Sequence, residues 1–203
     1  MGEPTIRLHG IVGEAPNTAA IIGATLTATP GPVVIEVNSP GGDVFEACAI
    51  AAAIEAHGDV TAHGVGIVAS AATLLTAVAS RSALHHAAQF MVHDPSSVAW
   101  GTAAELRRHA DDLEKTANHI ACIYSKYTGH PVSRIRGWMR DETWLDPEEA
   151  LALNFIDEIL EAPVRGKPVA QFDYTRFQNA PKKLLALTAR QGWAMQAPIE
   201  GAA

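Results

Sequence analysis

A serine and two glycines stand in contexts suited to acyl-transfer chemistry. Ser70 lies inside the small-residue run Gly64–Ala72, where an apolar strand is expected to give way to a helix. Gly41 and Gly42 end another apolar strand, in the run Ser39-Pro-Gly-Gly42. Glycine has no side chain, so the backbone at this point can approach a substrate carbonyl at close range. The serine would be the nucleophile of such a reaction.

A histidine and two acids further along the chain complete the set of groups that serine hydrolases use. His93 lies in Met91-Val-His-Asp-Pro95, and Asp141 and Glu142 lie in Arg140-Asp-Glu-Thr-Trp144. A serine at an alanine-rich helix start is by itself more often an N-cap than a nucleophile. The hypothesis of a serine hydrolase therefore depends on the combination of serine, histidine and acid on one α/β scaffold.

Composition and charge exclude some other classes of protein. The chain has 203 residues, which suits one domain with a substantial core, and 48% of its residues are hydrophobic. The net charge is −7 and the pI is about 5.7, so nothing indicates a basic face that binds nucleic acid.

The location of the protein is predicted from three features. Cys48 and Cys122 lie in expected helices among apolar neighbours, which predicts buried free thiols in a reducing compartment. The amino end, Met1-Gly-Glu-Pro, has no signal-peptide pattern. The small-residue stretch Gly64–Ser80 is shorter than the roughly 20 apolar residues of a membrane span. We therefore expect a cytoplasmic protein without membrane contact.

We expect neither a metal nor an organic cofactor. The pair His85-His86 has no cysteine or carboxylate at ligand spacing, so a zinc site is not predicted. Gly41 and Gly42 belong to no GxGxxG pattern and have no P-loop lysine, so no nucleotide site is predicted.

The elements that would position these groups alternate between strand and helix. Such alternation predicts a right-handed βαβ arrangement around a parallel sheet. The expected strands are Thr5–Val12, Val33–Val37, Val60–Val68, Gln89–His93 and Phe155–Leu160, and the first expected helices are Ile21–Thr27, Val44–Ala56 and Ser70–Ala79. Asp43 is expected to cap the second of these helices, and Gly58 to end it.

The longest predicted helix runs from a capping box at Thr102–Glu105 to the stop signal at Gly129 and Pro131. An apolar stripe follows it at steps of three, four or seven: Leu106, Leu113, Ala117, Ile120, Tyr124 and Tyr127. At 1.5 Å per residue the helix would be roughly 40 Å long. Its stripe then either fills the core or, because a small domain cannot cover it, meets another subunit.

The carboxyl-terminal part of the chain is patterned more weakly. Asp146-Pro147-Glu148-Glu149 predicts the capped start of a short helix that ends at Leu153. Regular patterning fades from Pro163 onward, where only Lys182–Trp193 is weakly helical.

Four motifs, by their order and spacing, resemble those of the proteolytic subunit of the ATP-dependent Clp protease. The sequence is most similar in type to the shorter members of this family that phages and prophages encode. The motifs are Asn38-Ser-Pro-Gly-Gly42, Val68-Ala-Ser-Ala-Ala72, Met91-Val-His-Asp-Pro95 and Asp141–Ala150. The resemblance covers roughly residues 5 to 160. It implies an α/β, crotonase-like spiral of ββα units, and a ring of subunits packed through the long helix. We accordingly divide the chain into a protease domain, 1–162, and a tail, 163–203.

The resemblance also implies roles for individual residues. Ser70 falls on the family's nucleophile and His93 on its general base. Gly42 and Ala71 fall on the two positions whose backbone N–H groups form the oxyanion hole.

The third member of the triad has two candidates. An ungapped alignment from Pro147–Ala150 backwards places the family acid on Glu142, whereas Asp141 is the residue type that the family prefers. We expect the two on a strand, where neighbouring side chains point to opposite faces, so only one can face His93. The register favours Glu142, with Asp141 as the alternative.

The resemblance predicts a serine endopeptidase that acts on proteins or peptides, with capsid maturation in a phage or prophage as one possible role. This sequence begins almost at the first strand, so the family's axial segment is short or missing, which argues against an AAA+ unfoldase partner. One alternative is a crotonase-type acyl-CoA enzyme, which would use the oxyanion hole without the triad. Another is a non-enzymatic assembly protein on the same fold.

Overall fold

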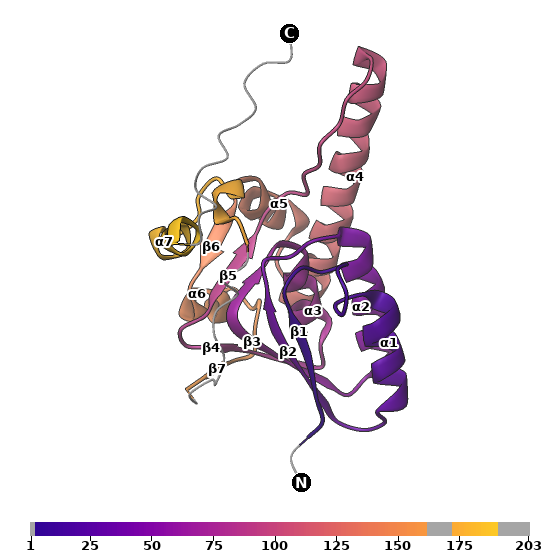
Figure 1. Cartoon of the computed structure of the whole chain (residues 1–203), viewed down its shortest axis with the longest axis vertical. Coiled ribbons are helices and arrows are strands. Elements are labelled where there is room, and N and C mark those ends of the chain that lie inside the picture. The colour runs from indigo at the N-terminus through magenta and orange to yellow at the C-terminus, as the bar shows by residue number, and fades with distance from the viewer. Residues whose placement is uncertain (1–2, 162–171, 191–203) are drawn as a thin grey trace.

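A computed structural model describes residues 3–161 and 172–190 of the chain, with all side chains except those of residues 189 and 190. Its centre is a seven-stranded sheet (Figure 1). The strands are Thr5–His9 (β1), Val33–Ser39 (β2), Val60–Ala69 (β3), Arg81–His85 (β4), Gln89–Val92 (β5), Thr143–Leu145 (β6) and Glu158–Leu160 (β7). The main order is β1-β2-β3-β4-β7, while β5 pairs with β3 and β6 with β5. Every pair is parallel, as the βαβ pattern predicted, with the exception of β5 and β6, which are antiparallel.

The described helices connect these strands and cover the sheet. The α-helices are Ala19–Ala28 (α1), Val44–His57 (α2), Thr73–Val78 (α3), Ala103–Thr128 (α4), Val132–Arg140 (α5), Pro147–Ala152 (α6) and Lys182–Arg190 (α7), and the 3-10 turns are Ser70–Ala72 (η1) and Tyr174–Arg176 (η2).

Local capping explains where the best-predicted helices begin and end. The Asp43 carboxylate accepts hydrogen bonds from the backbone N–H groups of Phe45 and Glu46, at 2.8 and 2.9 Å, at the start of α2. Gly58 ends α2 in the left-handed conformation, with φ +79°. The capping box of Thr102 and α4 is present in both directions, as is that of Asp146 and α6. The predicted starts of these three helices are confirmed.

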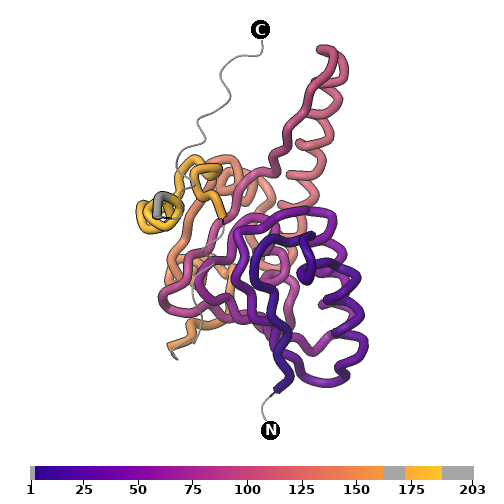
Figure 2. The backbone as a smooth tube through the Cα atoms, viewed as in Figure 1, coloured from indigo at the N-terminus to yellow at the C-terminus, as the bar shows by residue number. Residues whose placement is uncertain are grey.

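Helix α4 extends beyond the rest of the fold. Figures 1 and 2 show its amino-terminal half projecting away from the sheet. The stripe follows this division, since Ala117, Ile120 and Tyr124 are buried while Leu106 is 42% exposed. The carboxyl-terminal half of the helix fills the core of this chain, and its amino-terminal half is uncovered.

The two faces of β3 and β5 pack against different parts of the chain. Val68 and Phe90 face the main core, which α1 to α6 cover. Ile67, Ala69 and Met91 alternate with them and face a second cluster, which is built from η2 and α7. Figure 1 places α7 beside β5 and β6, away from α2 and α3. Residues 172–190 thus cover the second face of the sheet, while the predicted division of the chain at residue 162 stays a prediction.

Two predicted strands were too long. The first strand ends at His9 because its pairing with β2 ends there, and Val12 makes only an isolated bridge to Gly42. The last strand lacks its first expected residues, because Phe155 and Ile156 are buried in the main core instead of pairing with β4.

Other elements differ from the prediction or were not predicted. The expected helix Ser70–Ala79 is a 3-10 turn followed by α3. Strand β4 and helix α5 were missed. Helix α4 does end at the predicted stop signal, with Gly129 as its C-cap, but Pro131 also precedes the next helix, which was not predicted. The expected helix Lys182–Trp193 does begin at Lys182, and its expected end lies outside the described residues.

The expectation of two buried thiols was wrong for one cysteine. Cys48 is half-buried in α2, whereas Cys122 is exposed, because α4 is covered on one face only. Both thiols are free. None of the helices in the described part of the chain is long and apolar enough to span a membrane.

Candidate active site

Ser70 stands at the sharp turn where β3 passes into η1. Its φ of +56° lies in the left-handed region, which is uncommon for a residue other than glycine and frequent at functional sites. Gly41 approaches it so closely that an added Cβ would be 2.6 Å from the Ser70 Cβ. Thr73 fixes the turn, because its hydroxyl donates to the Ser70 carbonyl at 2.6 Å. The fold thus presents the serine beside a glycine loop, as the sequence suggested.

The structure brings His93 to Ser70. Strand β5 lies parallel to β3 with Met91 opposite Ala69, so the residues just beyond the two strand ends meet. His93 Nε2 is 2.8 Å from Ser70 Oγ, within hydrogen-bond distance. In this contact the imidazole can take the hydroxyl proton.

Burial and charge act in opposite directions on the protonation of His93. Burial lowers its pKa below the ordinary value of 6.5, while the negative charges of Glu142 and Asp94 act to raise the pKa. The net shift is downward, so the imidazole is neutral at neutral pH and available as a base.

The residue after His93 ties the end of β5 to the helices. Asp94 forms an ion pair with Arg136 of α5, and Arg136 also contacts Glu114 of α4 at 3.0 Å. The Asp94 backbone N–H donates to the Met139 carbonyl at 3.0 Å. These contacts fix the segment that carries His93.

The two candidate acids lie in a turn between α5 and β6, so the expectation that they share a strand was wrong. Asp141 is the C-cap of α5 with φ −81°, and Glu142 has φ +47°. Strand alternation therefore does not decide which acid faces inward; the turn does. Asp141 is exposed, whereas Glu142 is buried with 6% of its surface exposed.

Three N–H groups donate to the Glu142 carboxylate. Oε1 accepts from Asn179 N at 2.6 Å and from Trp144 Nε1 at 3.2 Å, and Oε2 accepts from Gln178 N at 2.8 Å. Within the part of the chain that the structure describes, no hydrogen bond joins Glu142 to His93. The carboxylate nevertheless lies near enough for its charge to influence the histidine.

Among the residues that the structure describes, the local hydrogen bonds leave the backbone N–H groups of the two proposed oxyanion donors, Gly42 and Ala71, without an acceptor. The bridge between Val12 and Gly42 uses Val12 N, which donates to Gly41 O at 2.9 Å, and Asp43 N, which donates to Val12 O at 3.0 Å, so it does not use Gly42 N. Ala71 lies in the first turn of η1, where N–H groups have no partner inside the helix. A Cβ at Gly42 would lie 2.2 Å from Val12 O, which requires glycine there.

Sequence reasoning missed two kinds of contact at the site. One is made by Trp144, which was assigned no role and whose indole N–H donates to Glu142. Gln178 and Asn179 belong to the tail, and they bond the Glu142 carboxylate through backbone N–H groups, which no residue type signals.

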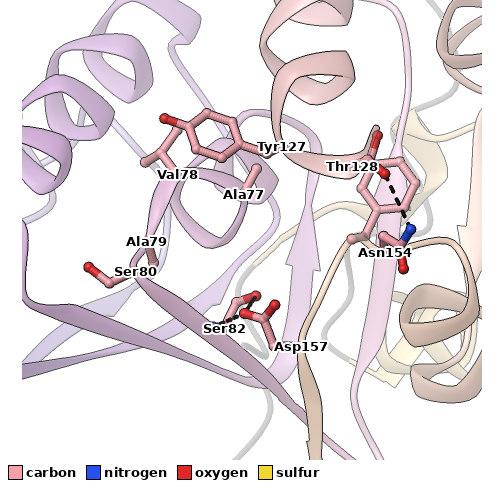
Figure 3. Close-up of a pocket in the computed structure, with 10 residues that line it drawn as sticks. Ala77, Val78, Ala79, Ser80, Ser82, Tyr127, Thr128, Asn154 and Asp157 are labelled. Atoms are coloured by element: carbon pink, nitrogen blue, oxygen red, sulfur yellow. Dashed lines mark hydrogen bonds between the residues drawn. The ribbon is translucent and has the colours of Figure 1, made fainter. Parts of the chain in front are cut away.

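A separate hollow lies between α3, α4 and the start of β4. Figure 3 shows its polar side chains bonded within the protein: Ser82 Oγ donates to Asp157 at 3.0 Å, and Asn154 Nδ2 donates to the Thr128 carbonyl at 3.3 Å. None of the candidate site residues lines this hollow, and we assign it no role in the chemistry.

A serine in contact with a neutral histidine, beside two backbone donors, can carry out nucleophilic acyl transfer. The fold and the site together therefore define a candidate serine hydrolase. Comparison with known proteins gives the family, since a family model described as Clp protease matches residues 17–163. The chain belongs to the Clp protease family. Its α/β fold with the long helix α4 is the fold predicted from the resemblance.

Individual relatives agree with this family. The chain is 34% identical over 132 residues to ATP-dependent Clp protease proteolytic subunit 2 of Thermobifida fusca (strain YX), covering 63% of this chain and 64% of that protein. It is 30% identical over 165 residues to proteolytic subunit 3 of Rhodococcus jostii (strain RHA1), covering 78% and 81%. It is also 30% identical over 133 residues to proteolytic subunit 2 of Treponema pallidum (strain Nichols), covering 64% and 67%.

Proposed function

We propose that this protein is a serine endopeptidase that hydrolyses peptide bonds in proteins or peptides. The observation that carries the proposal is the 2.8 Å contact between His93 Nε2 and Ser70 Oγ at the ends of two neighbouring parallel strands. Membership of the Clp protease family supports the same reaction class.

In the proposed mechanism, Ser70 Oγ attacks the peptide carbonyl while His93 accepts the hydroxyl proton. The proton then passes from His93 to the leaving amine, which leaves an ester between Ser70 Oγ and the acyl group. Water attacks this ester while His93 accepts its proton, and His93 returns a proton to Ser70 Oγ as the acid product is released. The N–H groups of Gly42 and Ala71 would bind the oxyanion, and one such donor is typically worth about 2.7–4 kcal/mol in the transition state. None of these steps requires a metal or an organic cofactor.

Glu142 is our choice for the third member of the triad, with Asp141 as the alternative. The burial of Glu142 and the influence of its charge on His93 support this choice. A carboxylate near the imidazole stabilises the imidazolium that forms during the reaction.

We further propose that the protein self-associates through α4. The helix presents Leu106 on its uncovered half. Val98 and Trp100, in the segment that precedes the helix, are 87% and 88% exposed. A second copy that covers this surface would produce the oligomeric ring expected from the resemblance. A role in phage or prophage capsid maturation and a cytoplasmic location stay predictions.

The acyl-CoA alternative makes a different demand on the site. Such an enzyme would use the oxyanion donors but not the serine. The Ser70–His93 contact therefore favours the peptidase over it.

The test is labelling with a fluorophosphonate followed by mass mapping of the modified residue. We expect a single adduct on Ser70 and hydrolysis of short fluorogenic peptides. Ser70→Ala should lose both the adduct and the hydrolysis, and it removes no helix cap, because the start of η1 has no side-chain cap hydrogen bond. Ser133→Ala, which alters an exposed serine of α5, is the matched control and should behave as wild type. Full hydrolysis by Ser70→Ala would end the proposal.

A further inference from the structure

The carboxyl-terminal segment Phe172–Arg190 reaches the candidate site from far along the chain. Its backbone N–H groups at Gln178 and Asn179 donate to the two oxygens of Glu142, at 2.8 and 2.6 Å. Gln178 and Asn179 follow Glu142 in the sequence by 36 and 37 residues. Two of the three donors on this carboxylate thus come from the segment.

The same segment also holds the turn that carries the acid. Asn179 Nδ2 donates to the Asp141 carbonyl at 3.0 Å, so one residue bonds both the backbone before Glu142 and its side chain. The positive φ of Glu142 is a strained conformation, and such conformations persist where surrounding contacts fix them. Asn179 supplies contacts of this kind.

Phe177 connects the segment to the histidine. Its ring meets the His93 imidazole edge-on, with centroids 5.6 Å apart, and meets the Trp144 indole at 5.5 Å. Phe177, Tyr174 and Leu184 are buried against Ile67, Ala69 and Met91 of the sheet. The segment is therefore packed in place rather than attached by its hydrogen bonds alone.

A glutamate needs more fixing than most side chains before it can act on a neighbour. It has three rotatable bonds, whose freedom is lost when the carboxylate takes one position. An ionised carboxylate has about four acceptor sites, of which the three described donors fill three. One site remains, on Oε2, for a further donor such as an imidazole N–H.

We propose that Phe177, Gln178 and Asn179 are positioning residues of the active site, which hold the Glu142 carboxylate and the His93 ring in their working arrangement. The segment 172–190 then supports the active site through these contacts and is not only a cover for the sheet. This inference rests on the proposed peptidase function.

Gln178 offers a clean test, because its side chain is exposed and its contribution to Glu142 is its backbone N–H alone. Gln178→Pro removes that N–H, whereas Gln178→Ala keeps it. We expect Gln178→Pro to lower kcat about 10- to 100-fold, the factor that corresponds to one hydrogen bond to a charged group. KM should change by less than about threefold, since the loss concerns the reacting groups and not substrate binding. Gln178→Ala should keep wild-type kcat.

Two kinetic results would overturn the inference. Equal kcat for the proline and alanine variants would mean that the N–H does no positioning. A higher kcat for Gln178→Pro would mean that the segment obstructs the site. If the proline variant does not fold, amide exchange of Gln178 and Asn179 is compared between wild type and Glu142→Gln. We expect faster exchange in the variant, and unchanged protection would equally refute the inference.

A measurement without turnover separates this inference from the proposed function. The groups around His93 that bear on its titration are Glu142 and Asp94, of which Asp94 is paired with Arg136, and the Ser70 hydroxyl. In Gln178→Pro the Glu142 carboxylate is held less firmly near His93, so its charge raises the pKa of the imidazole less. The pKa of His93 measured by NMR should therefore be lower in Gln178→Pro than in Gln178→Ala. If the wild type is inactive but this difference in pKa is still measured, the proposed peptidase function is refuted and the positioning role of the segment is supported. If the wild type is active but the two variants differ in neither pKa nor kcat, the peptidase function is supported and the positioning role is refuted.

Discussion

Replacing Glu142 by Gln tests the third member of the triad and has a cost that follows from its contacts. Both oxygens of the carboxylate accept hydrogen bonds from N–H groups. The NH2 group of a glutamine would therefore face a donor, and not an acceptor, whichever oxygen it replaced. If the amide oxygen takes the place of Oε1, the NH2 group faces the N–H of Gln178, and that hydrogen bond is lost. Losing a hydrogen bond to a charged group costs about 1.5–3 kcal/mol.

The assay therefore has a stability arm and a kinetic arm. For a domain of this size, a loss of that kind lowers Tm by about 2–4 °C for each kcal/mol. If Glu142 orients His93, kcat for a short fluorogenic peptide should fall by orders of magnitude, up to about 10⁴-fold, with little change in KM.

Asp141→Asn is the matched control, because Asp141 is exposed and takes part through its backbone carbonyl, which the substitution leaves in place. We expect its stability to stay within about 0.5 kcal/mol of wild type and its activity to be near normal. A large loss from Asp141→Asn beside near-normal Glu142→Gln would reverse the assignment of the acid. Full activity of both variants would mean that the enzyme works with a Ser–His dyad.

Two further predictions concern pH and assembly. Because burial lowers the pKa of His93 below 6.5, kcat/KM should be on its plateau at neutral pH and fall only below pH 6.5, as the imidazole gains a proton and can no longer act as a base; an acid limb centred above pH 7 in the rate profile would contradict this. Leu106→Glu, on the uncovered half of α4, should lower the mass of the assembly in sedimentation while the fold measured by circular dichroism stays intact; a wild-type protein that sediments as a monomer at micromolar concentration would refute the interface.

The parts of the fold that the sequence predicts are those fixed by neighbouring residues. The side chains of Asp43, Thr102 and Asp146 each cap a helix by accepting a hydrogen bond from a backbone N–H two or three residues later. Such short-range contacts are visible in the local sequence pattern. Helix α5 was missed because the proline before it carries two meanings. Pro131 can follow one helix or precede the next, and both are true here.

The meeting of Ser70 and His93 depends on strand order, which the sequence restricts but does not determine. It requires β5 to lie beside β3 in parallel, although β4 separates them in the chain. The resemblance to the Clp protease family did not supply that order, but it implied the roles of the two residues as nucleophile and base. Strand alternation, by contrast, was the wrong argument for Asp141 and Glu142, because these residues lie in a turn whose φ angles decide where each side chain points.

The contact between Glu142 and the tail was hidden for a physical reason, and a weaker signal pointed to it. Every residue except proline has a backbone N–H, so the types of Gln178 and Asn179 give no sign that they bond Glu142. Strand β5, however, is apolar at consecutive positions, and such a strand must be covered on both faces. The helices of the main core cover one face, which leaves Met91 and its neighbours to be covered by a later part of the chain. The apolar residues Tyr174, Phe177 and Leu184 meet that need. Once they are packed beside β5, the segment between Phe177 and Leu184 lies next to the end of that strand, where the acid and the histidine are.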